Sequence, residues 1–138
     1  MMGSMDTNDS LNTALVVADE KGSVLPAVTS LLEKAGFAVV TAPNAPAAIG
    51  RCRLERPPID LAVIDAADAS MTPAEIIRQL QDVCPRARLL FLCDDQTELP
   101  HEAASADQVR SFLRKPFRRA QFLGQVLEMM DKPRVMTA

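Results

Sequence analysis

Five short apolar runs alternate along the chain with segments that have helical periodicity. Several of these runs contain almost no polar side chain, which is typical of strands buried on both faces of a parallel sheet. The pattern therefore predicts five parallel strands joined by helical crossovers. The predicted strands are residues 14–18, 37–41, 59–65, 87–93 and 109–114.

The helical segments between the runs have recognisable ends. Gly36 is placed to end a first helix, because glycine readily adopts the left-handed conformation found just after helix C-termini. Asn44 can cap a second helix, and Thr72 with Glu75 forms a capping box at the start of another. An apolar stripe over residues 123–130 predicts a last helix.

The segment between the fourth and fifth predicted strands is the weakest helical candidate. Pro100 lacks a backbone N–H and disfavours helical geometry in the residue before it. We therefore expect residues 96–107 to be the least regular part of the domain, with a helix that begins no earlier than Leu99. His101 lies in this segment, and we expect it to be a solvated side chain.

The alternation of strands and helices predicts an α/β fold of the (βα)5 type. Right-handed crossovers place helices on both faces, which gives a doubly wound, five-stranded parallel sheet. The 138 residues are enough for one domain. We assign residues 12–132 to this domain, residues 1–11 to a flexible N-terminal tail and residues 133–138 to a C-terminal tail.

Composition and charge argue against several classes of function. The net charge of −3 provides no basic field for a nucleic-acid backbone. Five Phe with no Trp or Tyr argue against sites that stack bases or flavins on aromatic rings. Three cysteines without a Cys-x-x-Cys pair, and one histidine, make no zinc site and indicate a reducing cytoplasm. No apolar run approaches the roughly 20 residues that cross a bilayer, so we expect no membrane insertion.

Charged residues end or follow four of the five predicted strands. Asp19 and Glu20 follow the first, Asp65 ends the third, Asp94 follows the fourth and Lys115 follows the fifth. In a doubly wound sheet, ligands bind at the carboxyl ends of the strands. Carboxylates gathered at this edge repel one another, and a divalent cation such as Mg²⁺ relieves that repulsion. Each acid is alternatively a turn residue or helix cap, and the lysine alternatively a solvated surface residue.

Three segments combine an apolar strand with the charged residues at its end: residues 15–20 (LVVADE), residues 61–65 (LAVID) and residues 111–117 (SFLRKPF). Together they resemble the response-regulator receiver domain of two-component signalling. The third segment is the most specific, because it contains the family's aromatic-Leu-x-Lys-Pro-Phe pattern. The resemblance covers about residues 12–132 and implies the flavodoxin-like topology of receiver domains.

The resemblance implies a role for each residue that matches the family pattern. Asp65 matches the phosphoacceptor, Asp19 the acid that ligates Mg²⁺, and Lys115 the lysine that contacts the phosphoryl group. Ala67 would give its backbone carbonyl to the metal, which Asp65 also ligates, and Phe112 matches the aromatic switch position. This chemistry is coherent, because a carboxylate can form an aspartyl phosphate while Mg²⁺ and a lysine neutralise the phosphoryl oxygens.

The sequence departs from the receiver pattern at four places. Ala18 replaces the first acid of the usual pair, and Glu20 is a further candidate metal ligand that could compensate. Cys93 stands where the family has Ser or Thr, and its thiol is a weak hydrogen-bond donor. Asp94 adds bulk and negative charge beside the incoming phosphate, and residues 66–70 lack the common Met-Pro-Gly run.

Two interpretations of the function follow from the resemblance. One is a working receiver that accepts phosphate on Asp65 with Mg²⁺, from a histidine kinase or a histidine phosphotransfer protein, and signals through protein contacts. The other is a degenerate receiver that docks proteins without phosphorylation. Neither interpretation makes the protein an enzyme. Its only catalysed steps would be its own phosphorylation and dephosphorylation. The resemblance does not identify the downstream protein partner, and it is compatible with a homodimer. It also predicts a cis peptide bond between Lys115 and Pro116.

Two other α/β classes fit the sequence poorly. A haloacid-dehalogenase-type phosphatase needs a second aspartate two residues after its nucleophile, where this chain has Ala67. A flavodoxin-type electron carrier needs a Ser/Thr/Gly-rich phosphate loop and aromatic residues, whereas residues 19–24 read DEKGSV. Two interpretations of Cys93 are open. Lys115 could lower the pKa of its thiol, which would then sense oxidants, or Cys93 is a small apolar residue that fills the end of a strand.

Overall fold

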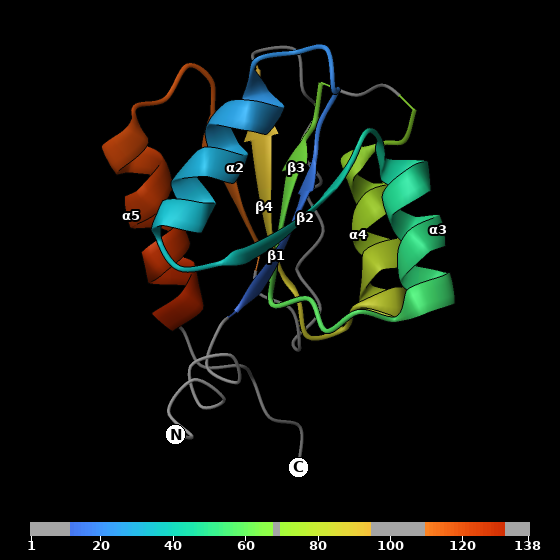
Figure 1. Ribbon diagram of the computed structural model, residues 1–138. Helices are drawn as coiled ribbons and strands as arrows, with labels where there is room; N and C mark the ends of the chain where they lie inside the picture. The colour runs from blue at the N-terminus through green and yellow to red at the C-terminus, as the bar shows by residue number, and fades with distance from the viewer. Residues whose placement is uncertain (1–11, 68–69, 95–109, 132–138) are drawn as a thin grey trace, which may run out of the picture.

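The computed structural model describes residues 12–67, 70–94 and 110–131. Five parallel strands form one sheet in the order β2-β1-β3-β4-β5 (Figure 1). The strands are β1 (Thr13–Val17), β2 (Ala38–Ala42), β3 (Leu61–Asp65), β4 (Arg88–Cys93) and β5 (Arg110–Arg114). The described helices are α2 (Val24–Lys34), α3 (Ala45–Glu55), α4 (Pro73–Val83) and α5 (Arg119–Asp131). The predicted doubly wound α/β fold is confirmed, with small differences at the strand boundaries.

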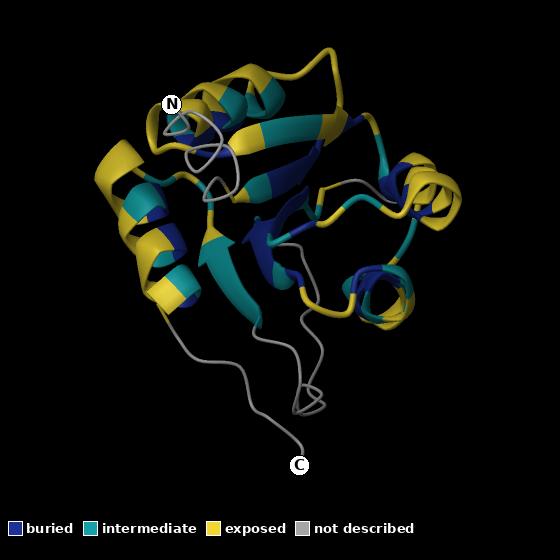
Figure 2. Cartoon of the chain, turned by 60° about the horizontal axis from the view of Figure 1, so that its bottom comes forward, coloured by how far each residue is buried: buried dark blue, intermediate teal, exposed yellow. Residues whose placement is uncertain are grey.

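The sheet is covered on both faces. Helices α2 and α5 lie on one side and α3 and α4 on the other (Figure 1). In β3, Leu61 and Val63 pack into the cluster with α2 and α5, whereas Ala62 and Ile64 pack into the cluster with α3 and α4. Burial is concentrated in the central strands and on the inner sides of the helices (Figure 2). This two-sided burial explains why the strands carry nearly continuous apolar runs.

The predicted signals at the helix ends are confirmed. The side chain of Asn44 accepts a hydrogen bond from the backbone N–H of Ala47 at 2.8 Å, which caps α3. Thr72 and Glu75 form both hydrogen bonds of the capping box at the start of α4. Gly36 follows α2 with a φ of 101°, a left-handed conformation that residues with a side chain rarely adopt. These ends depend on local contacts, which is why short sequence motifs are enough to predict them.

All three cysteines are free and buried on the same side of the sheet. Cys52 lies on α3, Cys84 follows α4 and Cys93 ends β4, and all three belong to the cluster that faces α3 and α4. Burial, with a smaller contribution from a hydrogen bond with Cys52, raises the pKa of the Cys84 thiol to about 12. The Cys84 thiol is therefore protonated at neutral pH.

Some predictions concern residues outside the described ranges. The two tails lie there, as does the segment 96–107 with Leu99, Pro100 and His101. These expectations stay predictions. Within the described ranges, no helix combines the length and the apolar character that a bilayer crossing requires.

Candidate functional site

Asp19 and Asp65 lie together at the carboxyl edge of the sheet. Asp65 is the last residue of β3, and Asp19 follows β1 by two residues. Because β1 and β3 pair in parallel, their carboxyl ends meet at the same edge, at the top of Figure 1. The two aspartates line one cleft of about 370 Å³ with Pro43, Asn44 and Ala67.

Lys115 reaches Asp65 from the end of β5. Its Nζ lies 2.7 Å from Oδ1 of Asp65, in an ion pair whose side chains are 24% and 12% exposed. The same Oδ1 accepts a hydrogen bond from the backbone N–H of Ala67 at 3.1 Å. Within the described part of the chain, Oδ2 of Asp65 accepts no hydrogen bond. This oxygen is therefore the one left for a metal or an incoming group.

The backbone around Lys115 also fixes its position. Its N–H donates to the carbonyl of Cys93 at 2.7 Å, which continues the pairing of β4 and β5 beyond the last strand residue. The Lys115–Pro116 peptide bond is cis, and this prediction is confirmed. Together with the ion pair to Asp65, the hydrogen bond to Cys93 holds the lysine over the strand ends.

Asp19 uses one carboxylate oxygen in a local turn. Its Oδ1 accepts a hydrogen bond from the backbone N–H of Lys21 at 2.9 Å. The other oxygen of Asp19 accepts no hydrogen bond from the residues that the structure describes. The turn interpretation and the ligand interpretation of Asp19 are therefore compatible.

The carboxylates in the cleft suit a small hard cation. Asp19 and Asp65 both line it, and Mg²⁺ is typically held by one or two carboxylates while water completes its shell. Across residues 12–67, 70–94 and 110–131, no three His, Cys, Asp or Glu side chains are grouped closely enough to hold an ion by themselves. Ala18, which is buried at the position of the missing acid, is one reason for this.

Glu20 does not line this cleft. It lines a separate hollow beside α2, which it shares with Leu25, Pro26 and Thr41 among others. The structure therefore gives no support to the idea that Glu20 compensates for Ala18 as a metal ligand.

The Cys93 thiol is turned into the core. Cys93 is 2% exposed, and its Sγ donates to the backbone carbonyl of Phe91 at 3.7 Å. Burial raises the pKa of the Cys93 thiol, and this effect outweighs the opposing influence of Arg114 and Lys115. A redox-sensitive thiolate needs a lowered pKa, so the structure favours the interpretation of Cys93 as an apolar filler.

Arg114 is a charged residue near the site that the sequence analysis missed. It stands opposite Cys93 in the register of β4 and β5. Its Nη1 donates to the backbone carbonyl of Asp94 at 3.3 Å. Successive side chains on a strand point to opposite faces of the sheet. The adjacency of Arg114 and Lys115 in the sequence therefore does not predict that both side chains make contacts at the carboxyl edge.

Phe112, the predicted switch residue, is half-buried on β5. Its ring stacks on that of Phe91, with the centroids 5.3 Å apart and the planes at 21°. Phe91 is fully buried in β4 within the cluster that faces α3 and α4, and Phe112 packs against that cluster. The orientation of Phe112 is therefore tied to the packing next to Cys93.

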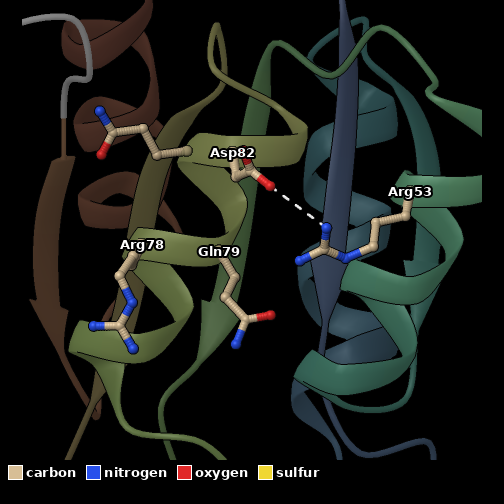
Figure 3. Close-up of a pocket in the computed structure, with 5 residues that line it drawn as sticks. Arg53, Arg78, Gln79 and Asp82 are labelled. Carbon is tan, nitrogen blue, oxygen red and sulfur yellow. Dashed lines mark hydrogen bonds and ion pairs between the residues drawn. The ribbon is translucent and has the colours of Figure 1, made fainter.

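A second hollow lies on the outer surface of α3 and α4. It has a volume of about 490 Å³ and is lined by Arg53, Arg78, Gln79, Gln81 and Asp82. Arg53 and Asp82 form an exposed ion pair across the two helices at 3.4 Å (Figure 3). Exposed pairs of this kind contribute about 0–1 kcal/mol. This hollow holds none of the predicted site residues.

Comparisons with known proteins bear on the fold. No family model matches the sequence, and no curated protein matches it. A receiver domain protein from Bacillus halodurans C-125 superposes with a TM-score of 0.69 at 18% identity, covering 90% of this chain and 99% of that one. A response regulator from Thermotoga maritima gives 0.64 at 25% identity, with 88% and 100% covered. The receiver domain of the hybrid histidine kinase CckA gives 0.67 at 18% identity, with 87% and 100% covered.

This chain spans nearly the whole length of each of these structures. The protein therefore has the flavodoxin-like fold of response-regulator receiver domains. This is the fold of the family that residues 15–20, 61–65 and 111–117 resemble in sequence.

Proposed function

We propose that this protein is a divergent receiver of two-component signalling that accepts a phosphoryl group on Asp65. The observation that carries the proposal is the ion pair of 2.7 Å between Lys115 Nζ and Asp65 Oδ1, beside Asp19, at the carboxyl edge of a receiver-type sheet. A nucleophilic carboxylate, a cation for the phosphoryl oxygens and a second carboxylate are the minimum that this chemistry needs. A surface used only for protein docking does not require this combination of three groups.

The transfer is an in-line displacement at phosphorus. Oδ2 of Asp65 attacks, the new O–P bond forms as the N–P bond of a phosphohistidine breaks, and the imidazole leaves with the bonding electron pair. Lys115, which lies at Oδ1, neutralises charge on the phosphoryl oxygens. Asp19, Asp65 and the Ala67 carbonyl would hold Mg²⁺, which supplies further positive charge to these oxygens.

The proposed donor is a histidine kinase or a histidine phosphotransfer protein. Among the similar solved structures, one is the receiver domain of a hybrid histidine kinase. The output of the receiver is then a contact with another protein, because the chain carries no basic field for nucleic acid.

A second candidate function is docking without phosphorylation. It is favoured by the Cys93 thiol, which donates to the Phe91 carbonyl instead of facing Asp65, and by the absence of an acid at Ala18. In this alternative, Asp65 and Lys115 form a structural ion pair and no phosphate is transferred.

Phosphate transfer to Asp65 can be tested directly. We expect the protein to gain one phosphate when it is incubated with acetyl phosphate and Mg²⁺, as read by intact mass. Asp65→Asn should gain none, because an amide is not a nucleophile of this kind. If the wild-type protein stays unmodified at every donor concentration while a partner still binds, the docking alternative is correct.

A divalent cation should stabilise the protein even without phosphate, because Lys115 alone does not neutralise both carboxylates of the cleft. At a Mg²⁺ concentration ten times the dissociation constant, the free energy of unfolding rises by about 1.4 kcal/mol. For a domain of this size that is a shift in Tm of roughly 5 °C. Asp19→Asn should lose this shift, whereas Asp131→Asn, at the exposed end of α5, should keep it. An equal shift in wild type and Asp19→Asn would contradict the proposed ligand set.

A further inference from the structure

Arg114 lies where the sequence departs most from the receiver pattern. It ends β5, directly before Lys115, and stands opposite Cys93 on β4. Its guanidinium reaches across to the start of the next loop, where Nη1 donates to the carbonyl oxygen of Asp94 at 3.3 Å. An arginine is charged at every accessible pH, so this contact places a permanent positive charge beside Asp94.

Four charged groups act on the Cys93 thiol from this end of the sheet. Arg114 and Lys115 are the cations, and Asp94 and Asp65 are the anions. Arg114 and Lys115 act to lower the pKa of the Cys93 thiol and the two carboxylates act to raise it, while burial raises it most. Arg114 is therefore part of the same electrostatic neighbourhood as Asp65, although Lys115 alone contacts the Asp65 carboxylate among the described side chains.

The charge balance at this edge explains why a second cation matters. A phosphoryl group on Asp65 carries about two negative charges at neutral pH. Without Arg114, Lys115 would be the one cationic side chain among these four charged groups, beside the Asp94 carboxylate and a phosphoryl group on Asp65. Like charges at one edge of the sheet repel one another, and an arginine beside Asp94 offsets part of that repulsion.

We propose that Arg114 is a positioning residue for phosphoryl transfer, whose charge compensates Asp94 and so allows a dianionic group to form on Asp65. This inference rests on the proposed function. Arg114 contacts the Asp94 backbone and lies outside the cleft formed by Asp19, Asp65 and Ala67, so it acts through Asp94 and does not touch the reacting atoms. Asp94 departs from the receiver pattern, and Arg114 occupies the unspecified position before Lys115: the carboxylate is tolerated because the guanidinium is present.

The test is a double-mutant cycle on the rate of phosphorylation by acetyl phosphate at fixed Mg²⁺. Arg114→Gln should be about twofold to fivefold slower than wild type, the size expected for one solvent-accessible charge contact. Arg114→Lys should keep most of the wild-type rate, since it keeps the charge. Arg110→Gln is the matched control, because it removes the same charge from the opposite end of β5, roughly 13 Å away. Its rate should equal that of wild type.

Asp94→Asn separates charge compensation from a merely structural contact. In the Asp94→Asn background, Arg114→Gln should slow the reaction less than twofold, because the carboxylate that Arg114 compensates has gone. The backbone carbonyl that Arg114 contacts is still present there, so a structural role would show the same loss in both backgrounds. The loss in the background that keeps Asp94 should also shrink in high salt, which screens an exposed charge.

The outcomes are distinguishable. A wild-type protein that is never modified overturns the proposed function and this inference with it. A wild-type protein that is modified, with Arg114→Gln equally fast, overturns this inference alone. The inference is also overturned if the loss is the same with and without the Asp94→Asn change and is insensitive to salt.

Discussion

Lys115→Met should slow the phosphorylation of Asp65 by acetyl phosphate about a hundredfold or more. The ammonium lies 2.7 Å from Oδ1 of Asp65 in a pair whose side chains are mostly shielded from solvent. A fixed cation at this place acts on the phosphoryl oxygens as charge develops, and removing one such group from a reacting centre typically costs a factor of about 10²–10³. The rate is measured by intact mass over time, at fixed Mg²⁺ and donor.

The control for this substitution is Lys34→Met, in the exposed last turn of α2. It removes the same charge from the protein far from the cleft, so its rate should equal that of wild type. Circular dichroism and urea unfolding verify that both variants remain folded. If Lys115→Met reacts as fast as Lys34→Met, the ion pair with Asp65 is structural and the proposed role of Lys115 is wrong.

The double change Cys93→Thr with Asp94→Ala should accelerate phosphorylation at least about tenfold. The Cys93 thiol now donates to the Phe91 carbonyl, and a threonine hydroxyl is a stronger donor that can serve a phosphoryl oxygen. A hydrogen bond to a charged oxygen is worth roughly 1.5–3 kcal/mol, which corresponds to about one to two decades in rate. Removing the Asp94 carboxylate adds to this gain, because it removes a like charge from the edge.

The two single variants show how much of the gain in rate comes from each substitution. Cys93→Thr alone tests the hydrogen bond, and Asp94→Ala alone tests the charge. Asp65→Asn is the blank for every rate. A wild-type protein that already reacts as fast as the double variant would mean that these departures from the receiver pattern do not limit the reaction.

The fold was predictable because its determinants are local or periodic. Buried parallel strands require apolar residues at almost every position, and residues 61–64 satisfy this in the sequence without any tertiary information. Asn44 and Thr72 cap helices through contacts three residues away, within the range of a short motif. The edge of the sheet follows from topology alone, since parallel strands place Asp19, Asp65 and Lys115 at one end.

The details of the site depend on where side chains turn, which a sequence does not show. The sequence places Glu20 next to Asp19, yet its side chain lines the hollow beside α2. The thiol of Cys93 is directed into the core by the packing of β4, and Arg114 crosses to the Asp94 carbonyl although strand alternation would send it away from Lys115. The Arg114 contact joins segments 20 residues apart, and the Cys93 thiol is buried against helices from elsewhere in the chain, so neither follows from a short motif.

The three cysteines give access to a different property, the cooperativity of the fold. Cys52, Cys84 and Cys93 lie in one core layer, between the sheet and the pair α3 and α4, and none is in a disulfide. An alkylating reagent reaches these thiols only in molecules whose layer has opened. The mass spectrum then separates two cases: molecules with either no label or three labels mean that the layer opens as a unit, and singly labelled molecules mean that its edges open separately. The natural sequence thus carries its own probe of local unfolding, with no engineered label needed.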